Sequence, residues 1–201
     1  MLTLPFQVTS GPVEAGWCAF EVRLGESSWS CRASLISSLP VSELIHSAID
    51  LYEHFFEYAI PLENAVWDSL AADEPGGIVI RATPEDGKVK VTIFHYPSEP
   101  MWPKPDELPG IPPVAVGLVD YWAYADAIYE DAARVIARHG VTGLRDAWES
   151  GSWGIDGLWT VFPFEHFLYL AALVKQRSPR HKLTLEDELG MLREILGKRQ
   201  G

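Results

Sequence analysis

The segment between Pro97 and Pro113 limits the possible folds more than any other part of this chain, because seven of the fifteen prolines lie in it. Proline has a fixed φ angle and no backbone N–H group, so this stretch can form neither a helix nor an interior strand. It separates residues 1–96 from residues 114–201. Met101 and Trp102 inside the segment favour packing against the body, since a free linker needs only polar residues and glycine. We therefore expect one compact domain overall, with residues 97–113 as a connecting segment.

Alternating apolar residues predict two β-hairpins in the first part. The turn at Glu85-Asp86-Gly87 is a strong hairpin signal, and Gly25-Glu26-Ser27 marks the other turn. A short strand over residues 2–8, interrupted by Pro5, is expected to precede them. Pro40 begins a helical pattern that stops at Pro61. The predicted hairpin strands are residues 17–24 with 28–36, and 77–83 with 88–96.

Helical periods dominate the second part. One apolar stripe runs from Leu118 to Ile136, and Pro163 suits the first turn of a further helix. Thr184 and Asp187 have the spacing of a capping box before a final leucine-rich helix, whose apolar face would include Leu185 and Leu189. The fold class predicted is α+β: an antiparallel sheet from two hairpins with one helix, followed by a helical C-terminal half.

The two cysteines are expected to be reduced. A pair of directly opposed sulfurs, Cys18 with Cys31, would require Leu24 to pair with Gly25 and leave no loop. A diagonal placement separates the Cα atoms by about 7–8 Å, too far for easy bridging. The expected free thiols, the lack of an apolar stretch of about 20 residues, and an N-terminus with neither a basic start nor a following apolar run favour a cytoplasmic protein with no membrane partner.

The charge is strongly negative and uneven. The whole chain carries −12, while the first 174 residues hold nine basic and 24 acidic side chains, a net charge of −15. Such a field repels nucleic acid and speeds encounter with basic proteins, although acidity also serves solubility alone. The outward positions of the two hairpins nevertheless gather basic and aromatic residues. That face could bind single-stranded nucleic acid, seat the acidic helix that carries Asp120 and Asp131, or stay solvated; we favour the last two. The basic residues are Arg23, Arg32, Arg81, Lys88 and Lys90, interleaved with Trp17, Phe94 and Tyr96.

Catalytic and metal signatures are weak. His46, Asp50 and His54 follow one another at four-residue steps, but the apolar stripe opposite already explains a polar face there. His95, predicted on the inner face of its strand, and the Glu165-His166 pair could form a buried acid/base site near Asp156. No nucleophile, P-loop or dinucleotide motif accompanies them. We therefore assign no catalytic residue, no metal ligand and no cofactor, and keep a small hydrolase-like enzyme as the alternative.

Tryptophan offers the best candidates for binding, because eight occur in 201 residues. Trp29 and Trp122 fall on core faces by periodicity, which favours a structural role. Others lie in or beside loops, where aromatic and acidic residues together are typical of protein-binding surfaces, although they could equally be edges of a second core. The predicted binding residues are Trp102, Trp148, Trp153, Asp156 and Trp159.

In size, charge and the order of elements from Leu2 to Tyr96, the chain resembles the small acidic immunity proteins that accompany bacterial polymorphic toxins. This resemblance implies an acidic, aromatic surface that neutralises a basic partner protein. It involves no signature motif, so it assigns no individual residue, and the sequence does not indicate an oligomeric state. The expected function is a cytoplasmic protein-binding module of the immunity or inhibitor type.

Overall fold

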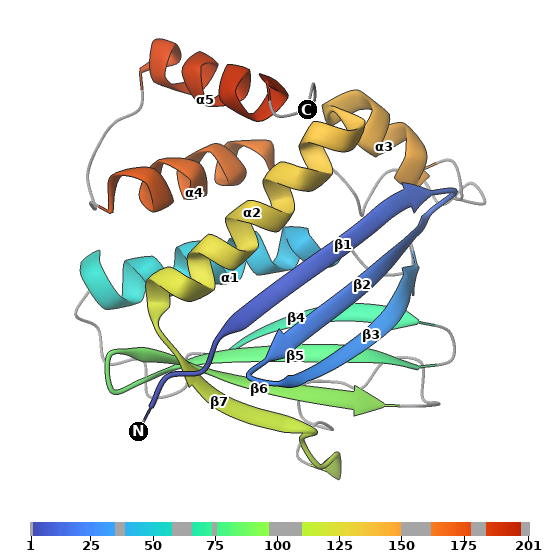
Figure 1. The fold of residues 1–201 in the computed structure, drawn as a ribbon, viewed down its shortest axis with the longest axis vertical. Helices are drawn as coiled ribbons and strands as arrows, with labels where there is room; N and C mark the ends of the chain where they lie inside the picture. The colour runs from blue at the N-terminus through green and yellow to red at the C-terminus, as the bar shows by residue number, and fades with distance from the viewer. Residues whose placement is uncertain are drawn as a thin grey trace.

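The computed structural model describes most of the chain: residues 2–34, 39–57, 66–73, 76–96, 110–149, 162–177 and 184–197. Within these ranges, strands come first, interrupted by one helix, and four helices follow (Figure 1). The α+β class predicted from the sequence is confirmed. The two hairpins, however, lie in two antiparallel sheets rather than in one.

The first sheet has the order β1-β2-β3, comprising Phe6–Glu14, Trp17–Leu24 and Ser27–Ser34. β1 begins directly after Pro5 and runs further than predicted, with a β-bulge between Ser10 and Val13. Cys18 faces Ala33 and Cys31 faces Phe20, so the two sulfurs belong to different cross-strand pairs, and both thiols are free.

The second sheet has the order β4-β5-β6-β7, comprising Trp67–Asp73, Gly76–Glu85, Lys88–Tyr96 and Ala115–Val119. The hairpin between β5 and β6 turns at Asp86 and Gly87, both with positive φ, as the sequence predicts. Its inner face is buried as expected, through Ile78, Ile80, Ala82, Val89, Val91 and Ile93. The N-terminal segment joins the sheets, because the backbone N–H of Leu4 donates to the carbonyl of Leu118 on β7 at 2.7 Å.

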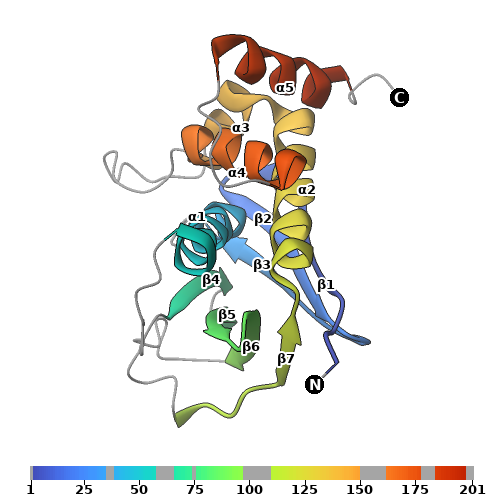
Figure 2. The same ribbon diagram turned by 90° about the vertical axis from the view of Figure 1, so that its left-hand side faces the viewer.

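The helices lie on one side of the strands, with α5 farthest from the sheets (Figure 2). Their bounds are Pro40–Tyr52 for α1, Tyr121–His139 for α2, Val141–Glu149 for α3, Phe164–Gln176 for α4 and Leu185–Gly197 for α5. One buried apolar cluster includes side chains from both sheets and from α1, α2, α3, α4 and α5. No helix in the ranges described is long and apolar enough to cross a membrane.

Helix ends follow local chemistry. The Asp120 carboxylate caps α2 by accepting hydrogen bonds from the backbone N–H groups of Trp122 and Ala123, at 2.9 and 3.2 Å. The capping box of α5 is confirmed, since the Asp187 backbone N–H donates to the Thr184 hydroxyl and the Asp187 carboxylate accepts from the Thr184 backbone N–H. Its predicted apolar face is only partly buried: Leu185 and Leu189 are exposed.

Candidate functional site

The predicted binding tryptophans cannot be placed. Trp102, Trp153, Asp156 and Trp159 lie outside the residues that the structure describes. Trp148 belongs to α3, but its side chain is also outside the description. These five residues therefore stay predictions from the sequence.

The buried acid/base site proposed as the alternative does not form from His95, Glu165 and His166, all of which are exposed. His95 is the penultimate residue of β6, where the inner face of the sheet reaches solvent, so its strand parity did not imply burial. Glu165 and His166 lie in the first turn of α4. The prediction of a buried His and Glu was therefore wrong.

His166 instead meets His46 of α1, with ring centroids 4.5 Å apart. Burial and the neighbouring His166 lower the pKa of His46, while Glu43 and Asp50 oppose this shift. The Asp50 carboxylate accepts a hydrogen bond from the Trp67 indole N–H at 2.7 Å. His54 lies beyond α1, in a π-helical turn, η1, at Glu53–Glu57. The helical repeat differs there from that of an α-helix, so four-residue spacing no longer keeps His46, Asp50 and His54 in one row. Among the residues described, no group of three or more His, Cys, Asp or Glu side chains is arranged to hold a metal ion.

The basic outward positions of the hairpins are engaged with neighbouring residues. Arg81 forms two hydrogen bonds to the Asp68 carboxylate, both 2.8 Å, and its guanidinium lies over Phe94. Arg32 lies over the Trp17 ring at 5.0 Å. The two hairpins belong to separate sheets, so these residues do not form the single basic face that a shared sheet would create. The acidic helix α2 packs against β1 instead.

A buried polar cluster attaches α2 to β1. The Asp131 carboxylate, with no exposed surface, accepts hydrogen bonds from the backbone N–H and the hydroxyl of Ser10, at 2.8 and 2.6 Å. Arg134 donates to the same carboxylate at 2.9 Å. Cys18 lies nearby, but burial and the Asp131 charge raise the pKa of its thiol to about 12, so it stays protonated and unreactive at neutral pH. This cluster is structural.

An aromatic cluster lies where η1 meets the start of α2; Tyr121 is buried in it, Phe55 is half-buried, and Phe56 is its exposed member. Phe56 has 48% of its surface exposed and stacks on Trp122, with ring centroids 5.6 Å apart. Phe55 and Tyr121 pack against Phe56 edge to face. Trp122, which periodicity assigned to the core, is only partly buried. We call these four residues, Phe55, Phe56, Tyr121 and Trp122, the aromatic patch.

One ion pair borders the aromatic patch. The guanidinium of Arg177, at the C-terminal end of α4, lies over the Trp122 ring at 4.9 Å and donates to the Asp126 carboxylate at 2.7 Å. Asp126 is one turn beyond Trp122 on α2. The ion pair therefore extends from the edge of the aromatic patch along α2.

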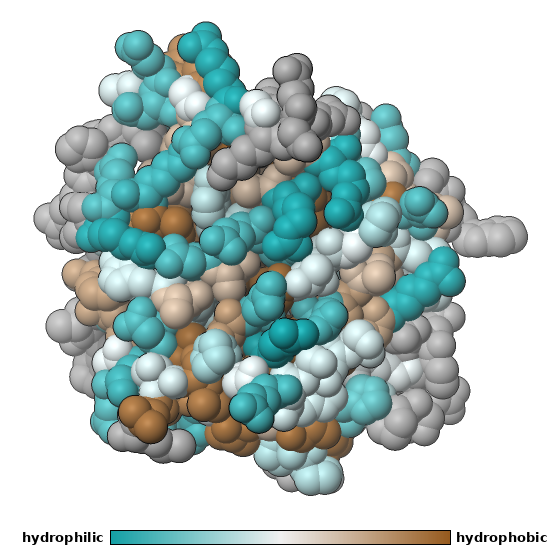
Figure 3. Space-filling model, viewed as in Figure 1, coloured by the Kyte–Doolittle hydropathy of each residue, from teal (hydrophilic) through white to brown (hydrophobic). Residues whose placement is uncertain are grey.

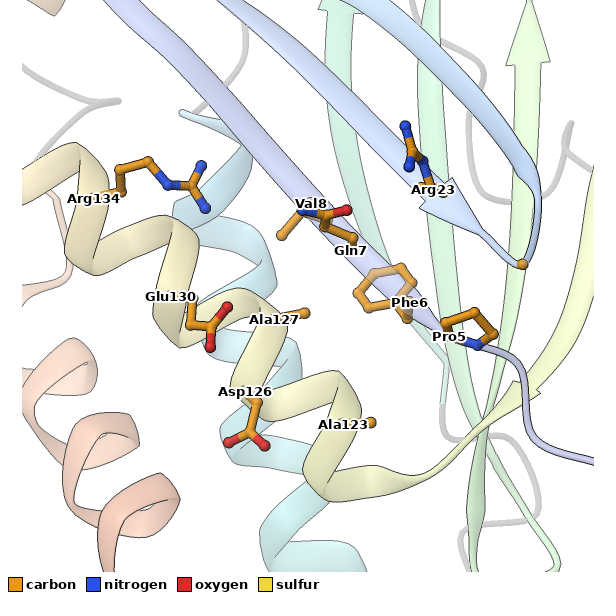
Figure 4. A pocket seen from close by; sticks show the side chains of 11 residues that line it. Pro5, Phe6, Gln7, Val8, Arg23, Ala123, Asp126, Ala127, Glu130 and Arg134 are labelled. Carbon is orange, nitrogen blue, oxygen red and sulfur yellow. The ribbon is translucent and has the colours of Figure 1, made fainter.

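A groove with a volume of about 530 Å³ lies between β1 and α2 (Figure 4). Asp126, one turn along α2 from Trp122, contributes to its lining. The face on which α2 crosses β1 is largely hydrophilic, with apolar residues along its lower edge (Figure 3). The residues that line the groove are Pro5, Phe6, Gln7, Val8, Arg23, Gly25, Ala123, Asp126, Ala127, Glu130 and Arg134.

Sequence reasoning missed both the aromatic patch and the groove. The signal for the patch was present in the adjacent Phe55 and Phe56 of η1, but their exposure depends on how α2 packs beside them. The groove is lined by residues from Pro5 to Gly25 and from Ala123 to Arg134, so no local sequence pattern predicts it.

Comparisons with known proteins identify no relative. No protein-family model matches this sequence, and no curated protein or solved structure matches it either.

Proposed function

We propose that this chain is a protein-binding module that docks a basic protein partner on the exposed side of α2, as an immunity protein or inhibitor does. The observation that supports this proposal is the aromatic patch, in which Phe56 is half exposed and stacks on Trp122. Large rings buried on binding supply much of the energy at protein interfaces. Single exposed apolar residues are ordinary, but Phe56 is in contact with a tryptophan, and tryptophan is among the residues enriched at binding hot spots.

Rigidity supports this role. The backbone N–H of Trp122 is held by the Asp120 carboxylate that caps α2. Phe56 is held by ring contacts, with centroids 5.1 Å from Tyr52, 5.4 Å from Tyr121 and 5.6 Å from Trp122. Rings that are held before binding lose little conformational entropy when a partner covers them. The patch is therefore ready to bind without rearrangement.

Charge supports the choice of partner. The chain carries −12, so its field attracts a basic protein over distances of about a Debye length. Arginine is among the residues enriched at binding hot spots, and it stacks well on tryptophan, as Arg177 does on Trp122. A basic interface with apolar side chains at its centre fits both features.

The test is a quantitative capture experiment with three baits: the native chain, Phe56→Ala, and the control Leu189→Ala. Leu189 is 41% exposed on α5, so its variant removes a similar exposed apolar group elsewhere. A basic protein captured by the native chain and by Leu189→Ala, but bound about 30-fold more weakly by Phe56→Ala, supports the proposal. Association should also slow as salt rises from about 0.05 to about 0.5 M. Equal capture by all three baits contradicts it.

A further inference from the structure

Glu130 differs from the other charged residues that line the groove. Asp126 is paired with Arg177 at 2.7 Å, Arg134 with the buried Asp131 at 2.9 Å, and Arg23 with Glu21 at 3.4 Å. Glu130 is exposed, and the described residues offer its carboxylate no hydrogen bond and no ion pair. Arg134, one turn further along α2, would be its usual helical partner but is held by Asp131 instead.

The groove also holds small apolar side chains near Glu130. Ala123 and Ala127 lie one turn apart on α2 and face β1, while Pro5 and Phe6 form part of the opposite wall (Figure 4). Alanine side chains leave room where larger residues would fill the groove. A long side chain with an aliphatic stem and a charged end can therefore lie along the two alanines and reach Glu130, as lysine and arginine do at protein surfaces.

We propose that this groove receives a lysine or arginine side chain of a protein partner, with the aliphatic stem along Ala123 and Ala127 and the cationic head at Glu130. The inference rests on the proposed function, because Asp126, one turn along α2 from Trp122 of the aromatic patch, also lines the groove. It adds the chemical class of the partner side chain, and its charge complements both Glu130 and the net charge of −12.

An anionic side chain is the competing occupant, since Arg23 and Arg134 also line the groove. The buried Asp131 already holds Arg134, and removing that contact would leave a fully buried carboxylate with less compensation. Arg23 lies on the far side of β1 from Glu130 in Figure 4. Both arginines are therefore poorer recognition groups for a ligand than Glu130.

The experiment uses three small probes, the N-acetyl amides of arginine, lysine and glutamate, titrated at low salt into the isotope-labelled full chain. Backbone amide chemical shifts in nuclear magnetic resonance report where each probe binds. We expect saturable shifts at Ala123, Ala127 and Glu130 with the two cationic probes, at dissociation constants in the millimolar range, and none with the glutamate probe.

The variants are Glu130→Lys, the milder Glu130→Gln, and the control Glu14→Lys. The control alters the net charge as much as Glu130→Lys does, but at an exposed position outside the groove, on β1. Binding should weaken at least about fivefold in both Glu130 variants and stay near the native value in Glu14→Lys. Three results would overturn the proposal: no saturable shifts at these amides, equal weakening in Glu130→Lys and Glu14→Lys, or preferential binding of the glutamate probe.

The two proposals fail separately. If a partner depends on Phe56 while the cationic probes do not bind at the groove, the protein-binding function stands and the groove has another role. If the probes bind at Glu130 but no captured protein depends on Phe56, the groove inference stands and the docking surface is wrong.

Discussion

Replacing Asp131 with alanine should strongly destabilise the chain, because this carboxylate holds β1 and α2 together from a fully buried position. The alanine leaves the backbone N–H and the hydroxyl of Ser10 buried without their acceptor, at a cost of about 1–3 kcal/mol each. Arg134 loses its partner as well, but its side chain is 39% exposed and water can replace the carboxylate. We therefore expect the free energy of unfolding to fall by about 3 kcal/mol.

Urea denaturation followed by tryptophan fluorescence measures this loss, with Glu130→Ala as the control one residue earlier on α2. Glu130 is exposed, so its variant should change the free energy of unfolding by less than about 0.5 kcal/mol. Ser10→Ala should cost about 1 kcal/mol, and the double variant should cost at least about 1 kcal/mol less than the sum of the two single losses. A loss below about 1 kcal/mol in Asp131→Ala, or strict additivity, would refute the assignment of this contact.

Two further predictions concern titratable groups. Cys18 should resist a thiol reagent in the native chain at about pH 8 and react only after unfolding, because burial and then Asp131 raise the pKa of its thiol to about 12; rapid native reaction in a Cys31→Ser variant would contradict this. His46 has a pKa below its ordinary value of about 6.5, so the unfolded chain binds its proton more readily and stability should fall as pH drops below about 6.5. Between about pH 7.5 and about pH 5.5, His46→Gln should lose less unfolding free energy than the native chain, and equal losses would contradict the shift.

Sequence reasoning predicted elements whose signals are local. Asp86 and Gly87 adopt the positive φ values that the turn demands, and the flanking alternation places both strands correctly. Pro40 begins α1, and Thr184 with Asp187 begins α5, because both signals depend only on backbone groups within one turn. These elements needed no knowledge of the rest of the chain.

Elements that depend on distant partners were missed. β7 contributes Leu118, which periodicity assigned to the following helix, because a five-residue strand carries too few residues to show its own period. β4 at Trp67–Asp73 is defined by its pairing with β5 rather than by alternation. The pairing of β4 and β7 with the second hairpin places the two hairpins in separate sheets. Strand parity alone does not show which strands share a sheet, so it could not show whether the basic residues form one face.

The burial of individual side chains was the other source of error, and it determines which residues can belong to the candidate site. His95 has the parity of the inner face but lies where β6 ends, while Trp122 has the period of the core but lies beside an exposed Phe56. Periodicity gives the direction of a side chain along its element, whereas its exposure depends on what another element places over it. The aromatic patch and the groove are products of tertiary packing in this sense.

The two sides of α2 connect stability with binding. Tyr124, Ile128 and Asp131 are fully buried on its inner side, and the Tyr124 hydroxyl lies 2.7 Å from the Ser47 hydroxyl of α1. The outer side carries Trp122 and Glu130, whose positions relative to β1 are fixed by those inner contacts. A recognition surface on a rigid helix keeps its geometry before the partner arrives, which lowers the entropic cost of association. Substitutions at Asp131 should therefore weaken binding through loss of the β1–α2 arrangement, whereas substitutions at Glu130 should weaken binding with the fold intact.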